Sequence, residues 1–256
     1  MSIQLFSLQG KTALITGSSR GLGHAIAMGM ADAGARIVLN GRDAASLQTI
    51  AAAMRETGAD ITELAFDVAS ETSVNAAFQT LDKQGIVVDI LVNNAGIQFR
   101  KPMVELDLAD WQRVIDTNLT STFLVGREAA KRMIARKQGG KIINIASLTS
   151  EVARATIAPY TAAKGGVKML TRSMAAEWAE HGIQANAIGP GYMHTALNQT
   201  LIDNPSFDAW VKNRTPARRW GQPDELVGCA IFLASHASNY VNGQIIYVDG
   251  GMLAVL

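Results

Sequence analysis

The chain has 256 residues, and its 23 Lys and Arg residues nearly balance its 22 Asp and Glu residues, giving a formal net charge of +1. One domain of this length can bury about three quarters of its unfolded surface, and without long runs of one charge the chain shows no electrostatic signature for non-specific binding of nucleic acid or anionic membranes. We therefore expect a small-molecule partner.

The single cysteine and the hydropathy of the chain bear on the cellular compartment of the protein. Cys229 is the single cysteine and lies in the apolar run 227–234, which excludes an intrachain disulfide and predicts a buried structural thiol. Residues 1–9 lack the basic and apolar regions of a secretory signal, and no apolar run reaches the length of a membrane span. These features predict a soluble, cytoplasmic protein. No His, Cys and Asp cluster has metal-ligand spacing, so we expect no catalytic metal.

The first element is a short apolar strand at residues 11–16, followed by a glycine loop at 17–23 and a helix-like segment at 24–34. Glycines at such a junction let the backbone approach a pyrophosphate, and the helix N-terminus favours an anion. The spacing G-x3-G-x-G differs from the common G-x-G-x-x-G fingerprint, and no Lys-Ser/Thr pair follows as in a triphosphate loop. The loop therefore predicts a nucleotide other than ATP.

Strands and helices then alternate. Strands are predicted at 36–40, 61–66 and 88–92, with helices at 44–57 and 70–84. This alternation is typical of βαβ units and a parallel sheet covered on both faces. Because no linker, repeat or low-complexity segment interrupts it, we predict a single domain over residues 1–256.

The turn after the second strand, Asn40-Gly41-Arg42-Asp43, bears on the form of the cofactor. An acidic residue here would hold ribose hydroxyls, whereas an arginine accommodates a 2'-phosphate. Arg42, with Arg20 of the glycine loop, favours NADP over NAD. Asp43 leaves NAD open, although we interpret this residue as the cap of the next helix.

The strand at 88–92 runs into Asn93-Asn94-Ala95-Gly96, a polar turn that suits the close approach of a ligand but could also be an ordinary turn. A long amphipathic helix is predicted within 107–136, and it contains Asn118. An amide is unfavourable in a helix interior, so Asn118 is expected to have a polar role.

A strand at 140–146 places Ser147 at its carboxyl end, and a helix from residue 159 would put Tyr160 and Lys164 on one face. A free tyrosine has a pKa of about 10, and an adjacent cation stabilises its phenolate, so the pair could act as a general acid and base. The Ser147 hydroxyl could orient a carbonyl or hydroxyl group. Taken alone, the pair could equally be a surface or packing feature.

The sixth strand is predicted at 184–188 and ends in Gly189-Pro190-Gly191. An irregular stretch follows to about residue 216, long enough to form a lid over an active site. A helix at 223–234 and a last strand at 244–248 complete the chain.

These motifs occur together and in order: Thr16-Gly17-x3-Gly21-x-Gly23, Asn93-Asn94-Ala95-Gly96, Asn118, Ser147, Tyr160-x3-Lys164 and Pro190-Gly191. The chain resembles classical short-chain dehydrogenases/reductases over essentially its whole length. The resemblance implies a doubly wound α/β Rossmann fold with a seven-stranded parallel sheet, a nicotinamide cofactor across the strand ends and a homotetramer.

The resemblance also implies residue roles. Tyr160 would be the acid and base, Lys164 would lower its pKa and hold the nicotinamide ribose, Ser147 would orient the carbonyl, and Asn118 would support a water-linked proton path. The predicted cofactor contacts are Gly17, Ser19, Arg20, Gly21, Leu22, Gly23, Asn40, Arg42, Asp67, Val68, Asn94, Ala95, Gly96, Tyr160, Lys164, Pro190, Gly191 and Thr195.

Polar residues that follow the strand ends should select the substrate. The candidates are Gln98, Arg100, Lys101, Ser147, Glu151, Arg154, Tyr160 and His194. Several are cationic, which favours a sugar acid over a fatty-acyl chain, although solvated surface charge is the alternative.

Within the family, segments 96–102, 213–221 and 247–252 resemble enzymes that interconvert D-gluconate and 5-keto-D-gluconate. The same segments are also similar to those of some 2-keto-3-deoxygluconate dehydrogenases and, more loosely, to those of 3-oxoacyl-carrier-protein reductases. A silent nucleotide-binding protein is a further alternative, but such a protein has no chemical need for Ser147, Tyr160 and Lys164 together.

Overall fold

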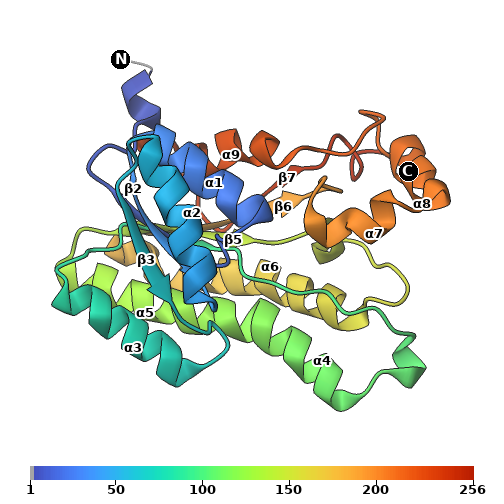
Figure 1. Cartoon of the computed structure of the whole chain (residues 1–256), viewed down its shortest axis with the longest axis horizontal. Coiled ribbons are helices and arrows are strands. Elements are labelled where there is room, and N and C mark those ends of the chain that lie inside the picture. The colour runs from blue at the N-terminus through green and yellow to red at the C-terminus, as the bar shows by residue number, and fades with distance from the viewer. Residues whose placement is uncertain (1–2) are drawn as a thin grey trace.

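A parallel sheet forms the centre of the computed structural model, which describes residues 3–256 (Figure 1). Residues 1 and 2, which belong to the predicted domain 1–256 and to the segment 1–9 predicted to lack a secretory signal, lie outside the described residues. The sheet has the order β3-β2-β1-β4-β5-β6-β7. Its strands are β1 (Thr12–Ile15), β2 (Arg36–Gly41), β3 (Ile61–Ala65), β4 (Ile90–Asn93), β5 (Gly140–Ile145), β6 (Ile183–Pro190) and β7 (Ile245–Val248). The predicted seven-stranded Rossmann sheet is confirmed.

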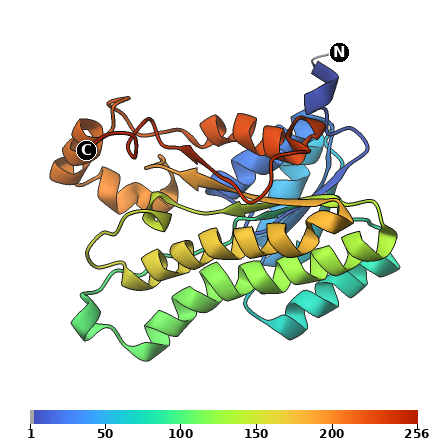
Figure 2. The same cartoon turned by 180° about the vertical axis from the view of Figure 1, so that it is seen from behind.

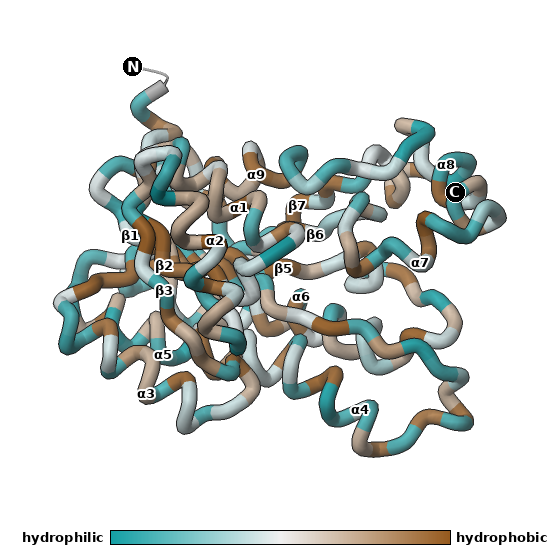
Figure 3. The backbone as a smooth tube through the Cα atoms, viewed as in Figure 1, coloured by the Kyte–Doolittle hydropathy of each residue, from teal (hydrophilic) through white to brown (hydrophobic). Residues whose placement is uncertain are grey.

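Helices cover both faces of this sheet (Figures 1 and 2). They are α1 (Gly21–Asp32), α2 (Ala44–Glu56), α3 (Glu71–Lys83), α4 (Leu108–Ile115), α5 (Ser121–Arg136), α6 (Ala158–Trp178), α7 (Gln199–Ile202), α8 (Pro205–Arg214) and α9 (Val227–Ala234). One buried cluster joins the sheet to α1, α2 and α9, and a second joins it to α3, α5 and α6. The strands are apolar on both faces for this reason, as the brown central strands in Figure 3 show. Among residues 3–256, no helix has the length and apolar character needed to span a membrane.

The predicted long helix at 107–136 is interrupted. Between α4 and α5, Asp116–Thr120 forms a π-helical turn with Asn118 buried inside it. Asn118 Nδ2 donates hydrogen bonds to the carbonyl oxygens of Ile97 (3.0 Å) and Val114 (2.8 Å), and the Ile97 N–H donates to Asn118 Oδ1 (3.1 Å). The amide thus ties the helix to the chain after β4 and satisfies backbone groups at the bulge.

The predicted irregular stretch at about 190–216 contains two helices, α7 and α8. The Asn204 side chain caps α8 by accepting hydrogen bonds from the N–H groups of Ser206 and Phe207, both at 3.1 Å, and Pro205 is the first residue of the helix. An Asn-Pro pair is a recognised helix start. Assigning this segment as irregular overlooked that signal.

A chain of buried side-chain amides connects β4 and β5 to α6. Asn93 Nδ2 donates to Asn144 Oδ1 (2.9 Å), and Asn144 Nδ2 donates to the Thr171 hydroxyl (2.9 Å). Asn144 is fully buried. Helix α6 also carries Tyr160 and Lys164. The hydrogen bonds from Asn93 through Asn144 to Thr171 therefore hold these two residues in place relative to the sheet.

Replacing Asn144 with Leu should therefore destabilise the fold. The buried amide of Asn93 would lose its partner, and an unsatisfied buried polar group costs about 1 to 3 kcal/mol. Urea unfolding measures the loss. Gln48→Leu, which also replaces an amide by leucine but at an exposed position of α2, is the matched control, and equal stability of the two variants would contradict the role of the amide chain.

Candidate active site

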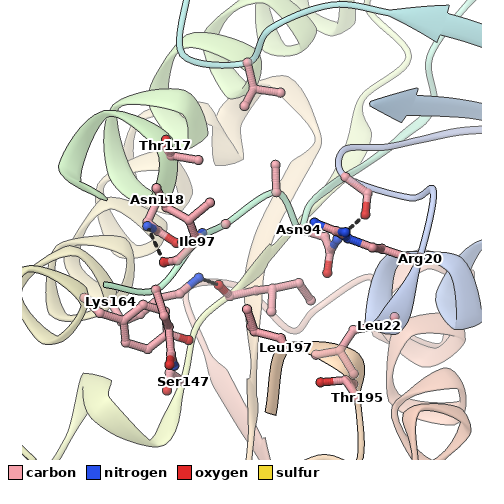
Figure 4. Close-up of a pocket in the computed structure, with 18 of the residues that line it drawn as sticks. Arg20, Leu22, Asn94, Ile97, Thr117, Asn118, Ser147, Lys164, Thr195 and Leu197 are labelled. Carbon is pink, nitrogen blue, oxygen red and sulfur yellow. Dashed lines mark hydrogen bonds between the residues drawn. The ribbon is translucent and has the colours of Figure 1, made fainter. Parts of the chain in front are cut away.

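A cavity of about 1010 Å³ lies at the carboxyl ends of the central strands. It brings together nearly all predicted site residues, several of which are labelled in Figure 4. Those that line it are Gly17, Ser19, Arg20, Gly21, Leu22, Asn40, Arg42, Asp67, Val68, Asn94, Ala95, Gly96, Gln98, Arg100, Asn118, Ser147, Arg154, Tyr160, Lys164, Pro190, Gly191 and Thr195. Of the predicted cofactor contacts, Gly23 alone does not line the cavity; it is buried in the first turn of α1 against Gly17 and Asn94.

Gly17 and Gly23 of the glycine loop are packed so tightly against the segment after β4 that side chains would not fit there. A Cβ on Gly17, which has φ +62°, would lie 2.9 Å from Ala95 Cα, and a Cβ on Gly23 would lie 2.4 Å from Asn94 Nδ2. Helix α1 begins at Gly21, within the glycine-rich segment, and its N-cap residue Arg20 provides no side-chain hydrogen bond. The first N–H groups of α1 are therefore suited to bind a pyrophosphate.

Two amides hold this loop in place. Asn94 Nδ2 donates to the Gly17 carbonyl oxygen (3.0 Å), and the Gly17 N–H donates to Asn40 Oδ1 (3.2 Å). Asn40 is buried, and its Nδ2 donates to the carbonyl oxygens of Leu64 and Phe66. The side chains of Asn40 and Asn94 thus position the glycine loop by hydrogen bonds to the backbone of Gly17.

The adenosine end of the cavity is cationic. Arg20 and Arg42 are exposed and line the cavity, and no ion pair within residues 3–256 includes either. The Ser46 N–H donates to Asp43 Oδ1 (2.6 Å), which lowers the pKa of the Asp43 carboxyl. The interpretation of Asp43 as the cap of α2 is confirmed.

Tyr160, Lys164 and Ser147 meet in the middle of the cavity. Lys164 Nζ lies 5.6 Å from the centroid of the Tyr160 ring and donates to the Ile145 carbonyl oxygen (2.5 Å). Burial raises the pKa of Tyr160, and hydrogen bonds with Ser147 and Gln98 oppose this rise. The pKa of Tyr160 is therefore raised, because burial outweighs the other influences. This direction is opposite to the lowering by Lys164 that was expected from the sequence. Burial also lowers the pKa of Lys164, to about 8.

The substrate end is also cationic. Arg100 Nη2 donates to Gln98 Oε1 (2.7 Å), and the Arg154 guanidinium carbon lies 4.3 Å from the centroid of the Phe207 ring. Burial, followed by the charge of Arg154, lowers the pKa of Arg100. In the described part of the chain neither arginine forms an ion pair. Two neighbouring guanidinium groups without a carboxylate partner are suited to an anionic ligand.

Three predicted substrate residues do not line the cavity. Glu151 is exposed, and its Oε1 accepts hydrogen bonds from Lys168 Nζ (2.5 Å) and the Tyr247 hydroxyl (2.7 Å). Lys101 pairs with a carboxylate outside the cavity, and His194 is exposed. A position shortly after the end of a strand does not by itself bring a side chain into the cavity, because these side chains point to other partners or to solvent.

Tyr192 was missed as a site residue. It lines the cavity, and it influences electrostatically both Arg100 and Tyr160. Its ring contacts Phe207 edge-on, with the centroids 5.6 Å apart. The available signal was its place directly after Pro190-Gly191, at the carboxyl end of β6.

The shifted pKa of Lys164 predicts a pH-dependent effect on stability. Folding lowers this pKa from 10.5 to about 8, so the unfolded chain binds more protons between these pH values and stability rises with pH across that window. Lys164→Met removes this cost. We expect its stability relative to the wild type to fall by about 1 to 3 kcal/mol between pH 7 and pH 10. A pH-independent difference in urea unfolding would contradict the shift.

Comparisons with known proteins agree with this geometry. A family model described as Enoyl-(Acyl carrier protein) reductase matches residues 17–253. Gluconate 5-dehydrogenase of Gluconobacter oxydans (strain 621H) is 46% identical over 252 residues, which cover 98% of each chain. The 2-dehydro-3-deoxy-D-gluconate 5-dehydrogenase of Formosa agariphila is 46% identical over 258 residues, covering 100% of this chain and 97% of that protein. A gluconate 5-dehydrogenase from Burkholderia cenocepacia J2315, solved with NADP and tartrate, is 49% identical with a TM-score of 0.98, and 100% of both chains is covered.

Proposed function

Because the chain belongs to the short-chain dehydrogenase/reductase family, we propose that it transfers a hydride between NADP(H) and a sugar acid, interconverting D-gluconate and 5-keto-D-gluconate. The two unpaired guanidinium groups of Arg100 and Arg154, in the same cavity as Tyr160 and Ser147, carry this proposal. They supply a carboxylate site in the cavity of the acid and base, and Gln98 interacts with both Arg100 and Tyr160.

The residues present fit a nicotinamide dinucleotide. Gly17 and Gly23 let the glycine loop pack against Ala95 and Asn94, with the start of α1 at the cavity for a pyrophosphate, and Arg20 and Arg42 are suited to a 2'-phosphate. When bound, the cofactor supplies or accepts the hydride. The Burkholderia relative was solved with NADP, which supports NADP here, while NAD is the alternative.

The protein's own task is to orient the substrate and move one proton. Tyr160 donates its hydroxyl proton to the carbonyl oxygen in reduction and removes it in oxidation. Ser147 orients that oxygen by a hydrogen bond. Lys164 holds the nicotinamide ribose and favours the phenolate, and Asn118 supports the proton path through its place in the π-helical turn.

The substrate carboxylate is placed against Arg100 or Arg154, which leaves the C5 hydroxyl to reach Tyr160. Tartrate, a hydroxylated dicarboxylate, in the Burkholderia relative supports an acidic, hydroxylated substrate. A 2-keto-3-deoxygluconate substrate shares this carboxylate and is the second candidate, supported by the Formosa relative. An acyl chain is disfavoured, because it would bury two guanidinium groups without a partner.

Assembly and location remain predictions. Phe123 on α5 and Met169 on α6 are 43% and 56% exposed, and such apolar groups on adjoining helices (Figure 2) support a homotetramer. The balanced charge and the single cysteine support a cytoplasmic location.

Tyr160→Phe tests the chemistry, since it removes the transferable proton alone. Turnover of gluconate should fall by about a hundredfold or more, while NADPH still binds, as measured by fluorescence titration. Turnover near that of the wild type would refute the role of Tyr160.

Arg42→Ala tests the cofactor. The KM for NADP should rise about tenfold, because a charge-assisted contact to the 2'-phosphate is lost, whereas the KM for NAD should stay within about twofold. Arg36→Ala, at the opposite end of β2 and paired with Asp60, is the matched control. Equal use of both cofactors by the wild type would count against the assignment.

Arg100→Met and Arg154→Met test the substrate. Loss of a charge-assisted hydrogen bond should lower kcat/KM for gluconate roughly ten- to a hundredfold in at least one variant. The kcat/KM for D-glucitol, in which an alcohol replaces the carboxylate, should be unchanged in both variants. The sugar-acid assignment fails if both variants keep the wild-type preference for the acid, or if the wild type prefers the polyol or an acyl thioester.

A further inference from the structure

Arg154 lines the cavity from the segment between β5 and α6, and it contacts an aromatic ring that does not itself line the cavity. Its guanidinium carbon lies 4.3 Å from the centroid of the Phe207 ring, a cation–π distance. Phe207 belongs to the first turn of α8, in the segment after β6, of which Tyr192 and Leu201 line the cavity. The contact therefore joins a cationic residue of the cavity wall to a helix outside the cavity.

Phe207 is itself held by other aromatic rings. It contacts Tyr192, Trp210 and Trp220, with centroids 5.6, 5.3 and 6.4 Å apart. Trp220 is buried, and its Nε1 donates to Asp208 Oδ1 (2.8 Å), one residue after Phe207. These contacts leave the Phe207 ring little freedom to move, so its face is a fixed surface for Arg154.

A fixed ring at this point has an electrostatic use. The charge of Arg154 lowers the pKa of Arg100, so the two cations repel each other in the absence of an anion. An aromatic face stabilises a guanidinium without neutralising it. The charge of Arg154 consequently stays available to a carboxylate, which an aspartate or glutamate partner would have prevented.

We propose that Phe207 is a specificity-determining positioning residue that holds Arg154 for the substrate carboxylate, so that the preference for an acid over an uncharged polyol depends on this ring. The residue acts through Arg154 and does not touch the reacting atoms. This inference rests on the proposed sugar-acid function and adds to it the means by which acids are distinguished from uncharged polyols.

Phe207→Leu tests the proposal, because it keeps an apolar side chain and removes the ring. The KM for gluconate should rise about three- to tenfold, with kcat within about twofold and with kcat/KM for D-glucitol unchanged. Phe207→Tyr keeps the ring and should restore the wild-type KM. Phe6→Leu, the same exchange at an exposed ring that does not line the cavity, is the matched control and should leave the selectivity for the acid unchanged.

A double-mutant cycle separates positioning from a general structural role. In the Arg154→Met background, Phe207→Leu should have no further effect on the KM for gluconate. An undiminished effect in that background, an equal loss on both substrates, or no rescue by Phe207→Tyr would overturn the proposal. If Phe207→Leu does not fold, as judged by thermal unfolding, Phe207→Met replaces it with a side chain of closer volume.

Failure of this inference can be distinguished from failure of the proposed function. A wild type that does not oxidise gluconate with NADP refutes the proposed function. If the wild type oxidises gluconate with NADP, but the Phe207→Leu variant keeps the wild-type preference for the acid over the polyol, only the role of Phe207 is refuted.

Discussion

The close approach of the glycine loop to the segment after β4 is the contact on which the cavity depends. Neither Gly17 nor Gly23 could carry a Cβ without meeting Ala95 or Asn94. Strands β1 and β4 are neighbours in the sheet, and their connections leave toward opposite faces. Such a switch point opens a crevice, and here backbone atoms and short polar side chains form its walls. The rest of the site is arranged along that crevice.

The charge distribution along the cavity follows from this arrangement. Arg20 and Arg42 line the cavity after β1 and β2, Arg100 and Arg154 line it after β4 and β5 on the other side of the switch point, and Tyr160 on α6 lines the same cavity. A ligand pair with anionic groups at both outer ends and a reactive carbonyl in the middle would match this pattern. Burial raises the pKa of Tyr160, so its hydroxyl keeps the proton at neutral pH, which suits its role as the acid in reduction.

The sheet and most of the site could be predicted because they depend on local patterns. The alternation of apolar strands and amphipathic helices defines a parallel sheet, and such a sheet brings Ser147 and the glycine loop to one edge regardless of side-chain detail. The direction of the Glu151 side chain could not be predicted, because its partner Tyr247 is distant in the sequence. Nor could the pKa direction of Tyr160, which depends on how deeply the assembled fold buries the ring.

The π-helical turn at Asp116–Thr120 sets the rotational phase of α4 relative to α5. One residue of an α-helix corresponds to a rotation of about 100°, so an uninterrupted helix would turn the residues Ala109, Gln112 and Arg113, which line the cavity, away from it. In evolutionary terms, the gain or loss of a single residue at this point could exchange the side chains on one wall of the cavity while the sheet and the glycine loop stayed unchanged.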